Sequence, residues 1–168
     1  MLKKIISGGQ TGVDRAGLDA AIKFSIPHGG AIPRGRRTED GVLPEYYNLT
    51  ELSSTSYPAR TEKNVVDADA TVIFSHGPLS NGSLLTKKKA LLYKRPVLHL
   101  DLRRIDIDKA ASLLVEFIRS QAVEVLNIAG PRASGDPYIY GATLFVLEVA
   151  LSAISKNVSV ENVKNEDP

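Results

Sequence analysis

The chain of 168 residues contains no cysteine and no tryptophan, and only three histidines. Without cysteine it forms no disulfide, no thiolate metal site and no thiol nucleophile. His28, His76 and His99 are scattered through the sequence and lack the spacing of zinc ligands, so no metal site is expected. Thiol chemistry is excluded by composition alone.

Long apolar runs and a strong net charge are also missing. No run reaches the ~18 apolar residues that a bilayer span needs, so no membrane partner is expected. The first residues, Met-Leu-Lys-Lys, lead straight into an apolar stretch and leave no room for a signal peptide, which predicts a cytoplasmic protein. A net charge of +2 is too small to indicate a nucleic-acid partner.

What remains is the composition of an ordinary globular protein, with 24% charged and 43% hydrophobic residues. The length is typical of one domain with a full core. We therefore expect a single ligand-binding domain over residues 1–155. The residues from 156 to 168 are polar and are expected to form a C-terminal tail.

Short apolar runs alternate with helical patterns about five times along the chain. Strands are expected near residues 4–6, 26–32, 70–74, 96–100 and 123–128, and a short edge strand within 46–52. Helices are expected near residues 12–22, 60–68, 83–93, 108–121 and 140–154, with Asp108 as an N-cap, and a long loop over 34–47. This order predicts an α/β fold, a Rossmann-like three-layer sandwich with a mainly parallel sheet.

A glycine-rich bend joins the first strand to the first helix. Glycines allow the backbone to turn sharply and approach a ligand, and the following helix N-terminus favours an anion. The spacing matches neither the dinucleotide fingerprint nor the Walker A motif. We interpret the bend as a phosphate-binding loop, so that Gly9→Val should abolish binding without unfolding the domain; the alternative is a tight turn. Its candidate ligand residues are Gly8, Gly9, Gln10, Thr11 and Gly12.

Two more glycine-containing bends, residues 77–82 and 130–135, follow expected strands. Ligands of parallel α/β sheets bind at the carboxyl ends of the strands, so the three bends should meet there. Helix capping and plain turns are the alternatives. The candidate ligand residues from these two bends and the helix after the first of them are Asn81, Gly82, Ser83, Thr86, Gly130 and Arg132.

Basic residues complete the candidate set. Arg34 and Arg37 follow the second expected strand, and guanidinium groups suit phosphate because they donate two parallel hydrogen bonds. A solvated turn neutralised by nearby carboxylates is the alternative. Arg60 and Asn64 lie near the start of another expected helix, where they either contact the ligand or cap and pair within the helix.

These motifs resemble the molybdenum carrier family, within the lysine-decarboxylase-like (Lonely Guy) superfamily. The resemblance runs from about residue 5 to 147 and depends on residues 7–15, 29–30, 33–41, 60–65, 69–71 and 127–132. It covers Arg15, which joins the candidate ligand residues. The resemblance implies a Rossmann-like fold, a homo-oligomer, and a bound molybdenum cofactor or nucleotide.

Two positions depart from the pattern of the family and its relatives. Asn81 stands where the family has glycine, and Thr86 stands where the phosphoribohydrolase relatives carry a catalytic glutamate. No catalytic residue is therefore assigned, and the predicted function is a carrier that binds a phosphorylated pterin or a nucleotide-like ligand. The alternatives are a nucleotide-processing enzyme with Asp14 or Glu39 as acid/base, and a nucleotide sensor that changes its assembly.

Overall fold

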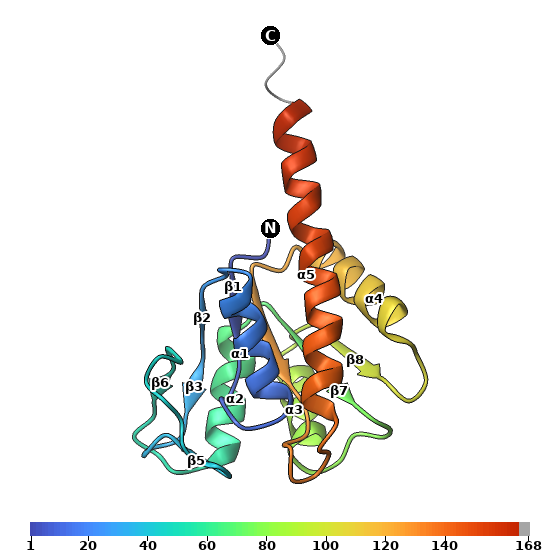
Figure 1. The fold of residues 1–168 in the computed structure, drawn as a ribbon. Helices are drawn as coiled ribbons and strands as arrows, with labels where there is room; N and C mark the ends of the chain where they lie inside the picture. Colours follow the sequence, from blue (N-terminus) through green and yellow to red (C-terminus); the bar gives the residue numbers. More distant parts are fainter. Residues whose placement is uncertain (165–168) are drawn as a thin grey trace.

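A five-stranded parallel sheet forms the centre of the computed structural model, which describes residues 1–164 and the side chains of residues 1–156 (Figure 1). The strand order is β2-β1-β9-β7-β8, and every neighbouring pair is parallel. This arrangement confirms the predicted Rossmann-like sheet. The strands are β1 (Lys4–Ile6), β2 (His28–Gly29), β7 (Ala70–Ser75), β8 (Val97–Asp101) and β9 (Val125–Ala129).

Helices cover both faces of this sheet and make a three-layer sandwich (Figure 1). On one side, α1 (Val13–Lys23) and α4 (Ile107–Ser120) both pack against α5 (Ile139–Lys164). On the other side, α2 (Tyr57–Asp67) packs against α3 (Asn81–Leu92). The right-handed crossovers of parallel strands require helices in these places.

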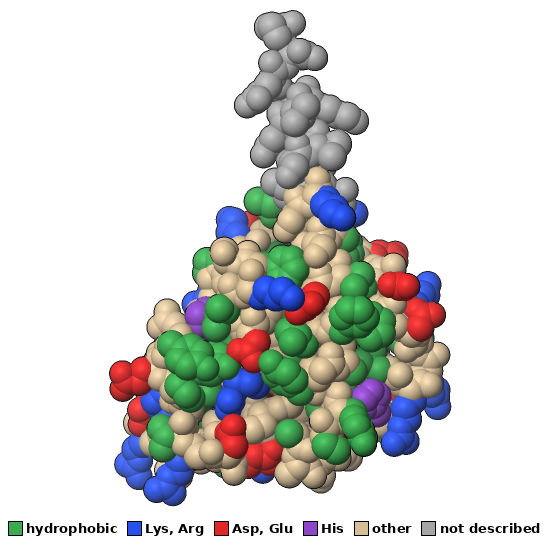
Figure 2. All heavy atoms as spheres, viewed as in Figure 1, with side chains coloured by type: hydrophobic (Ala, Val, Ile, Leu, Met, Phe, Trp, Pro, Cys, Tyr) green, Lys and Arg blue, Asp and Glu red, His purple; other side chains and the backbone are tan. Residues whose placement is uncertain are grey.

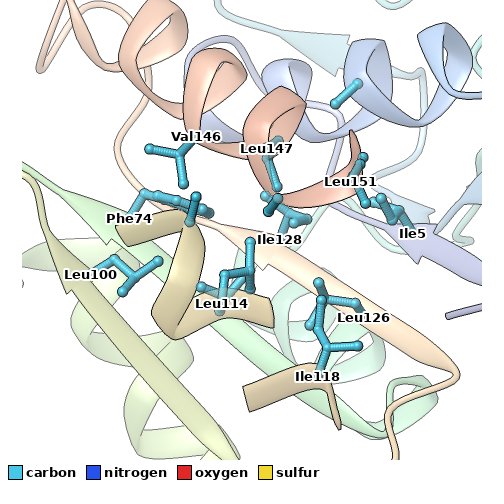
Figure 3. Close-up of a cluster of buried hydrophobic side chains, with 14 of the residues drawn as sticks. Ile5, Phe74, Leu100, Leu114, Ile118, Leu126, Ile128, Val146, Leu147 and Leu151 are labelled. Atoms are coloured by element: carbon cyan, nitrogen blue, oxygen red, sulfur yellow. The ribbon is translucent and has the colours of Figure 1, made fainter. Parts of the chain in front are cut away.

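The main core lies between the sheet and the layer formed by α4 and α5. Phe74 and Ile128 from the strands meet Leu114 of α4 and Leu147 of α5, and none of the four is more than 1% exposed (Figure 3). All six residues of β7 are buried, because this strand is covered on both faces. That explains why β7 is mainly apolar and why its two hydroxyl residues, Thr71 and Ser75, are buried as well. Burial of each large side chain contributes roughly 1.5–3 kcal/mol.

The second expected strand and the loop after it differ from the prediction. Gly30, with a φ of 121°, divides the strand into β2 and β3 (Ala31–Ile32), and β3 leaves the main sheet to pair with β6 (Thr50–Glu51). The expected loop over residues 34–47 contains a small hairpin of β4 (Arg37–Thr38) and β5 (Gly41–Val42). Two-residue strands carry no periodicity that a sequence could reveal.

Two helix ends also differ. Asp106, rather than Asp108, caps α4, because its carboxylate accepts a 2.8 Å hydrogen bond from the backbone N–H of Lys109. Helix α5 continues to Lys164, ten residues beyond the expected end at Ile154. Part of the expected polar tail is therefore helical. Residues 165–168 of that tail lie outside the described residues, and the limits of the single domain stay a prediction.

Helix α5 contains the one segment, within the described residues, that is long and apolar enough to cross a membrane by composition. The segment Ile139–Lys156 has a mean hydropathy of 1.4, and one third of it is buried. In the fold this helix packs against α1 and α4. A single helix of this kind is weak evidence for a membrane protein, because core helices pass the same test.

Candidate functional site

A cavity of about 490 Å³ lies at the carboxyl ends of the strands. All three glycine-containing bends contribute to its wall, through Gln10 from the first, Gly82 from the second, and Gly130 and Gly135 from the third. Its volume falls in the range of small-molecule sites. The sequence analysis predicted from the strand order that these bends meet, and in the structure all three line one cavity.

The N-terminus of α3 forms one part of the cavity wall. The N-cap residue Ser80 makes no side-chain hydrogen bond to the first turn, so no side chain caps the helix N–H groups there. Gly82 and Ser83 line the cavity, and a Cβ added to Gly82 would meet no atom within 4 Å. The glycine therefore borders open space, where a ligand could approach the backbone closely.

Asn81 is the first residue of α3, and Thr86 lies in the second turn of the same helix. Asn81 has a φ of 44°, in the left-handed region where asparagine is tolerated better than most side chains. The Thr86 hydroxyl donates a 2.9 Å hydrogen bond to the carbonyl of Gly82, so it supports the turn from within the helix.

A buried ion pair lies beneath the cavity. Arg60 Nη1 donates a 3.0 Å hydrogen bond to Asp14 Oδ2, and the two side chains are 14% and 6% exposed. Burial raises the pKa of Asp14, and the Arg60 guanidinium and the backbone N–H of Gln10 oppose that rise. Arg60 Nε is buried without a hydrogen-bond partner among the residues that the structure describes. A Cβ on Gly8 would lie 1.5 Å from Arg60 Nη1, so Gly8 makes room for this guanidinium.

Gln10 supplies a second unpaired donor. Its Oε1 accepts hydrogen bonds from the backbone N–H groups of Thr11 (3.0 Å) and Glu39 (2.9 Å), which determines the orientation of the amide. Its Nε2 is buried with no partner among the described residues, and the residue is 6% exposed. Buried polar groups without partners are rare in proteins, so this donor indicates a missing acceptor.

At Gly9 and Gly12 of the first bend, an added Cβ would point into protein. Gly9 has a φ of 73°, and a Cβ there would lie 2.8 Å from the Cδ2 atoms of both Leu43 and Leu49. Gly12 also has a φ of 73°, and its Cβ would lie 2.4 Å from the carbonyl oxygen of Pro131. That carbonyl accepts a 3.2 Å hydrogen bond from Val13 N–H, so the third bend occupies the start of α1.

Thr11, Gly12 and Arg15 line a separate cavity of about 290 Å³ beside α1. The Arg15 guanidinium pairs with Asp40 at 3.2 Å and lies 5.3 Å from the centre of the Tyr47 ring. Its Nε, like that of Arg60, is buried without a partner among the described residues. Direct ligand contacts from this first helix turn stay a prediction.

Of the predicted basic and helix-start ligand residues, some line the cavity at the strand ends and others do not. Arg60 and Arg132 line the large cavity. Arg34 and Arg37 are exposed and line neither cavity, so their ligand contacts stay a prediction. Asn64 is buried and bonds both backbone groups of Ala31, accepting from its N–H at 2.7 Å and donating to its carbonyl at 3.2 Å, which holds β3 in place.

Sequence reasoning missed a side-chain pair in the cavity wall. His76 Nδ1 lies 2.8 Å from Asp136 Oδ2, and both residues line the cavity. Sixty residues separate the two positions, so no local motif marks them. The one available signal was the position of His76 directly after the expected strand 70–74, at the sheet end where ligands bind.

Glu39 joins the hairpin to the third bend. Its carboxylate accepts hydrogen bonds from the Thr11 hydroxyl and from the hydroxyl and backbone N–H of Ser134, the last at 3.0 Å. Partial desolvation acts to raise the pKa of Glu39, but the bonds from Ser134 and Thr11 outweigh it and hold that pKa below its usual value. Glu39 therefore connects the hairpin to the first and third bends beside the cavity.

The structure thus defines a Rossmann-like α/β protein with a polar cavity at the carboxyl end of its parallel sheet. Residues 5–151 match the circularly permutated YpsA SLOG family, and the chain belongs to this family. The crystal structure of a "putative molybdenum carrier protein" from Syntrophus aciditrophicus SB is 56% identical, with a TM-score of 0.88. The match covers 89% of this chain and 95% of that one, and it confirms the resemblance to molybdenum carriers. A comparison with curated proteins found no match.

Proposed function

We propose that the protein is a non-catalytic carrier that binds a phosphorylated pterin, such as that of the molybdenum cofactor, or a related nucleotide in the large cavity. The observation that carries this proposal is the set of residues that line one cavity. Gln10 and Arg60 each carry a buried donor, Nε2 and Nε, that has no partner among the described residues, and Ser80 does not cap the N-terminus of α3. We expect a ligand with several acceptor oxygens to bind this helix N-terminus and to supply the acceptors that the two side chains lack.

The phosphate of such a ligand would lie at the N-terminus of α3, against the backbone of Gly82 and Ser83. Arg60 and Arg132 line the same cavity and would balance its charge. The Cβ-free space at Gly82 fits a group that approaches the backbone closely. The whole cavity, of about 490 Å³, has the volume of a site for a ligand of this size.

The specific link to molybdenum rests on the name of the related protein from Syntrophus aciditrophicus SB. The donor set on the cavity wall supports any phosphorylated ligand of this size. We propose that this carrier works in the cytoplasm, since the one apolar helix of the described residues packs against α1 and α4.

Native mass spectrometry of freshly purified protein tests the proposal. We expect a co-purifying mass that accounts for a phosphorylated pterin or nucleotide, with molybdenum detected in parallel by elemental analysis. Phosphorylated ligand without molybdenum would support the cavity and remove the metal from the proposal. Protein that is free of ligand and fails to bind added nucleotides or pterin phosphates would contradict the carrier function.

A second candidate, a nucleotide-processing enzyme, is favoured by the Asp14 carboxyl. It lines the cavity, and burial raises its pKa, as is common for acid/base catalysts. Against this, Thr86 stands at the position of the relatives' glutamate and bonds within its own helix. Incubation with nucleoside monophosphates decides between the two: released base supports the enzyme, and intact nucleotide supports the carrier.

We also propose self-association through α5, as the family resemblance implies. Phe145 on this helix is 57% exposed, and hydrophobic side chains are interspersed with charged ones over the face formed by α1 and α5 (Figure 2). Sedimentation of the wild type and of Phe145→Lys tests this surface, with a smaller species expected for the variant. If added nucleotide also changes the wild-type species, the protein acts as a sensor rather than a passive carrier.

A further inference from the structure

The His76–Asp136 pair has no part in the phosphate contacts proposed above. The two side chains are 21% and 16% exposed, and they line the same cavity as the donor groups. Asp136 Oδ1 accepts a 3.2 Å hydrogen bond from the backbone N–H of Tyr138, and Oδ2 contacts His76 Nδ1. The carboxylate is therefore held at both oxygens, and it determines the orientation of the imidazole.

This contact also determines what the imidazole can offer to a ligand. A carboxylate can only accept a hydrogen bond, so the ring proton of a neutral His76 lies on Nδ1. Its Nε2 then carries a lone pair, and within the described residues no hydrogen-bond partner uses it. In that neutral form, His76 offers one oriented acceptor in a cavity that Gln10, Arg60 and Arg132 also line.

A bare oxyanion could not use this acceptor, because phosphate and molybdate oxygens mainly accept hydrogen bonds. The neighbouring hydroxyl of Ser75 offers no substitute, since it already donates to the Gly77 carbonyl at 2.6 Å and contacts His99 Nε2 at 2.7 Å. Pro78 and Leu79 in the same wall provide apolar surface of the kind that covers the face of a flat ring.

We propose that His76, positioned by Asp136, accepts a hydrogen bond from a ring N–H or amino group of the ligand. The ligand class is then a phosphorylated N-heterocycle with such a donor edge, which guanine and pterin rings share. This inference rests on the proposed function, because it needs the phosphate to bind in the same cavity. It makes His76 a specificity-determining residue and Asp136 a positioning residue.

Titration calorimetry with matched ligands tests the inference. Guanosine 5′-monophosphate carries the donor edge, and purine riboside 5′-monophosphate has the same phosphate, sugar and ring system without it. We expect the guanine nucleotide to bind about tenfold more tightly, the ratio that corresponds to one net hydrogen bond. A 6-hydroxymethylpterin phosphate serves as the second arm and distinguishes a pterin carrier from a guanine nucleotide carrier.

Variants of His76 and Asp136 test whether these two residues cause the difference in affinity between the two nucleotides. His76→Ala should reduce the ratio to about one, because the affinity for guanosine 5′-monophosphate falls more than that for purine riboside 5′-monophosphate. His76→Gln, whose amide oxygen can take the place of Nε2, should restore part of the discrimination. Asp136→Asn should lower the ratio because the imidazole is no longer held, whereas Asp108→Asn on α4 serves as a matched control and should not.

The outcomes separate the two levels of the proposal. A wild-type ratio near one, or a ratio that His76→Ala leaves intact, would overturn the role of His76 and preserve the phosphate site. A failure of both nucleotides and the pterin phosphate to bind would overturn the proposed function together with this inference. A variant that loses affinity for every ligand equally would show a structural role and contradict the assignment.

Discussion

Gly9 offers a sharp test of how the first bend works, because sequence and structure lead to different expectations. The motif alone suggests that a side chain at Gly9 would occupy ligand space. In the structure, a Cβ there would lie 2.8 Å from Leu43 Cδ2 and Leu49 Cδ2 and 3.3 Å from Ile32 Cδ1. These residues belong to the second buried cluster, so Gly9→Ala should damage the fold.

The expected loss has two parts. A non-glycine residue in the left-handed conformation, here at a φ of 73°, costs roughly 1–2 kcal/mol. Overpacking a filled core costs roughly 1–3 kcal/mol more. The free energy of unfolding of Gly9→Ala should therefore fall by about 2–5 kcal/mol, a large fraction of the stability of a typical domain.

Urea denaturation of the wild type and of two glycine variants measures this loss. Gly35→Ala is the matched control, since Gly35 has a φ of 85° but its Cβ would meet only the flexible Arg37 side chain at 3.4 Å. The difference between the two variants isolates the contact with the core, because both carry the backbone strain. Equal losses for both variants, or a stable Gly9→Ala that fails only in ligand binding, would refute the reasoning.

Three further changes test the fold around the cavity. Glu39→Gln should destabilise the protein at neutral pH, because it weakens the hydrogen bonds to Ser134. Folding lowers the pKa of Glu39, so the stabilisation by this carboxylate is present above its ordinary pKa of 4.5 and is lost as the pH falls through the lower folded value. The unfolding curves of wild type and variant should therefore converge in acid. Asn64→Ala leaves the N–H and carbonyl of Ala31 unpaired and should cost about 1–3 kcal/mol in chemical denaturation. Leu147→Ala in the main core should cost about 2–5 kcal/mol, and a loss below 1 kcal/mol by the same assay would contradict its packing.

The sheet could be predicted because its signals are local. The apolar run over β7 and the glycine bends after the strands required no knowledge of distant contacts, and the rule for parallel sheets then placed the bends at one edge. The same logic failed at the α4 cap, where Asp106 and Asp108 both satisfy the residue preference and only the geometry selects one.

The roles of individual site residues could not be predicted, because they depend on partners far away in the chain. Gly8 accommodates Arg60, which lies more than fifty positions later, and His76 meets Asp136 across sixty. Among the loop arginines, Arg36 donates to several backbone carbonyls, including that of Leu43 at 3.1 Å, and so serves as internal support. Composition alone does not distinguish it from its exposed neighbours.

The central claim is that the N-terminus of α3 receives the phosphate of a ligand, and paired glycine variants test it most directly. Gly82 and Gly141 both lie in the first turn of a helix, and a Cβ at either would meet nothing within 4 Å, but only Gly82 lines the cavity. Calorimetry with guanosine 5′-monophosphate should show at least a tenfold loss of affinity for Gly82→Val and none for Gly141→Val, with both variants as stable as each other. Unchanged binding by Gly82→Val would contradict the claim.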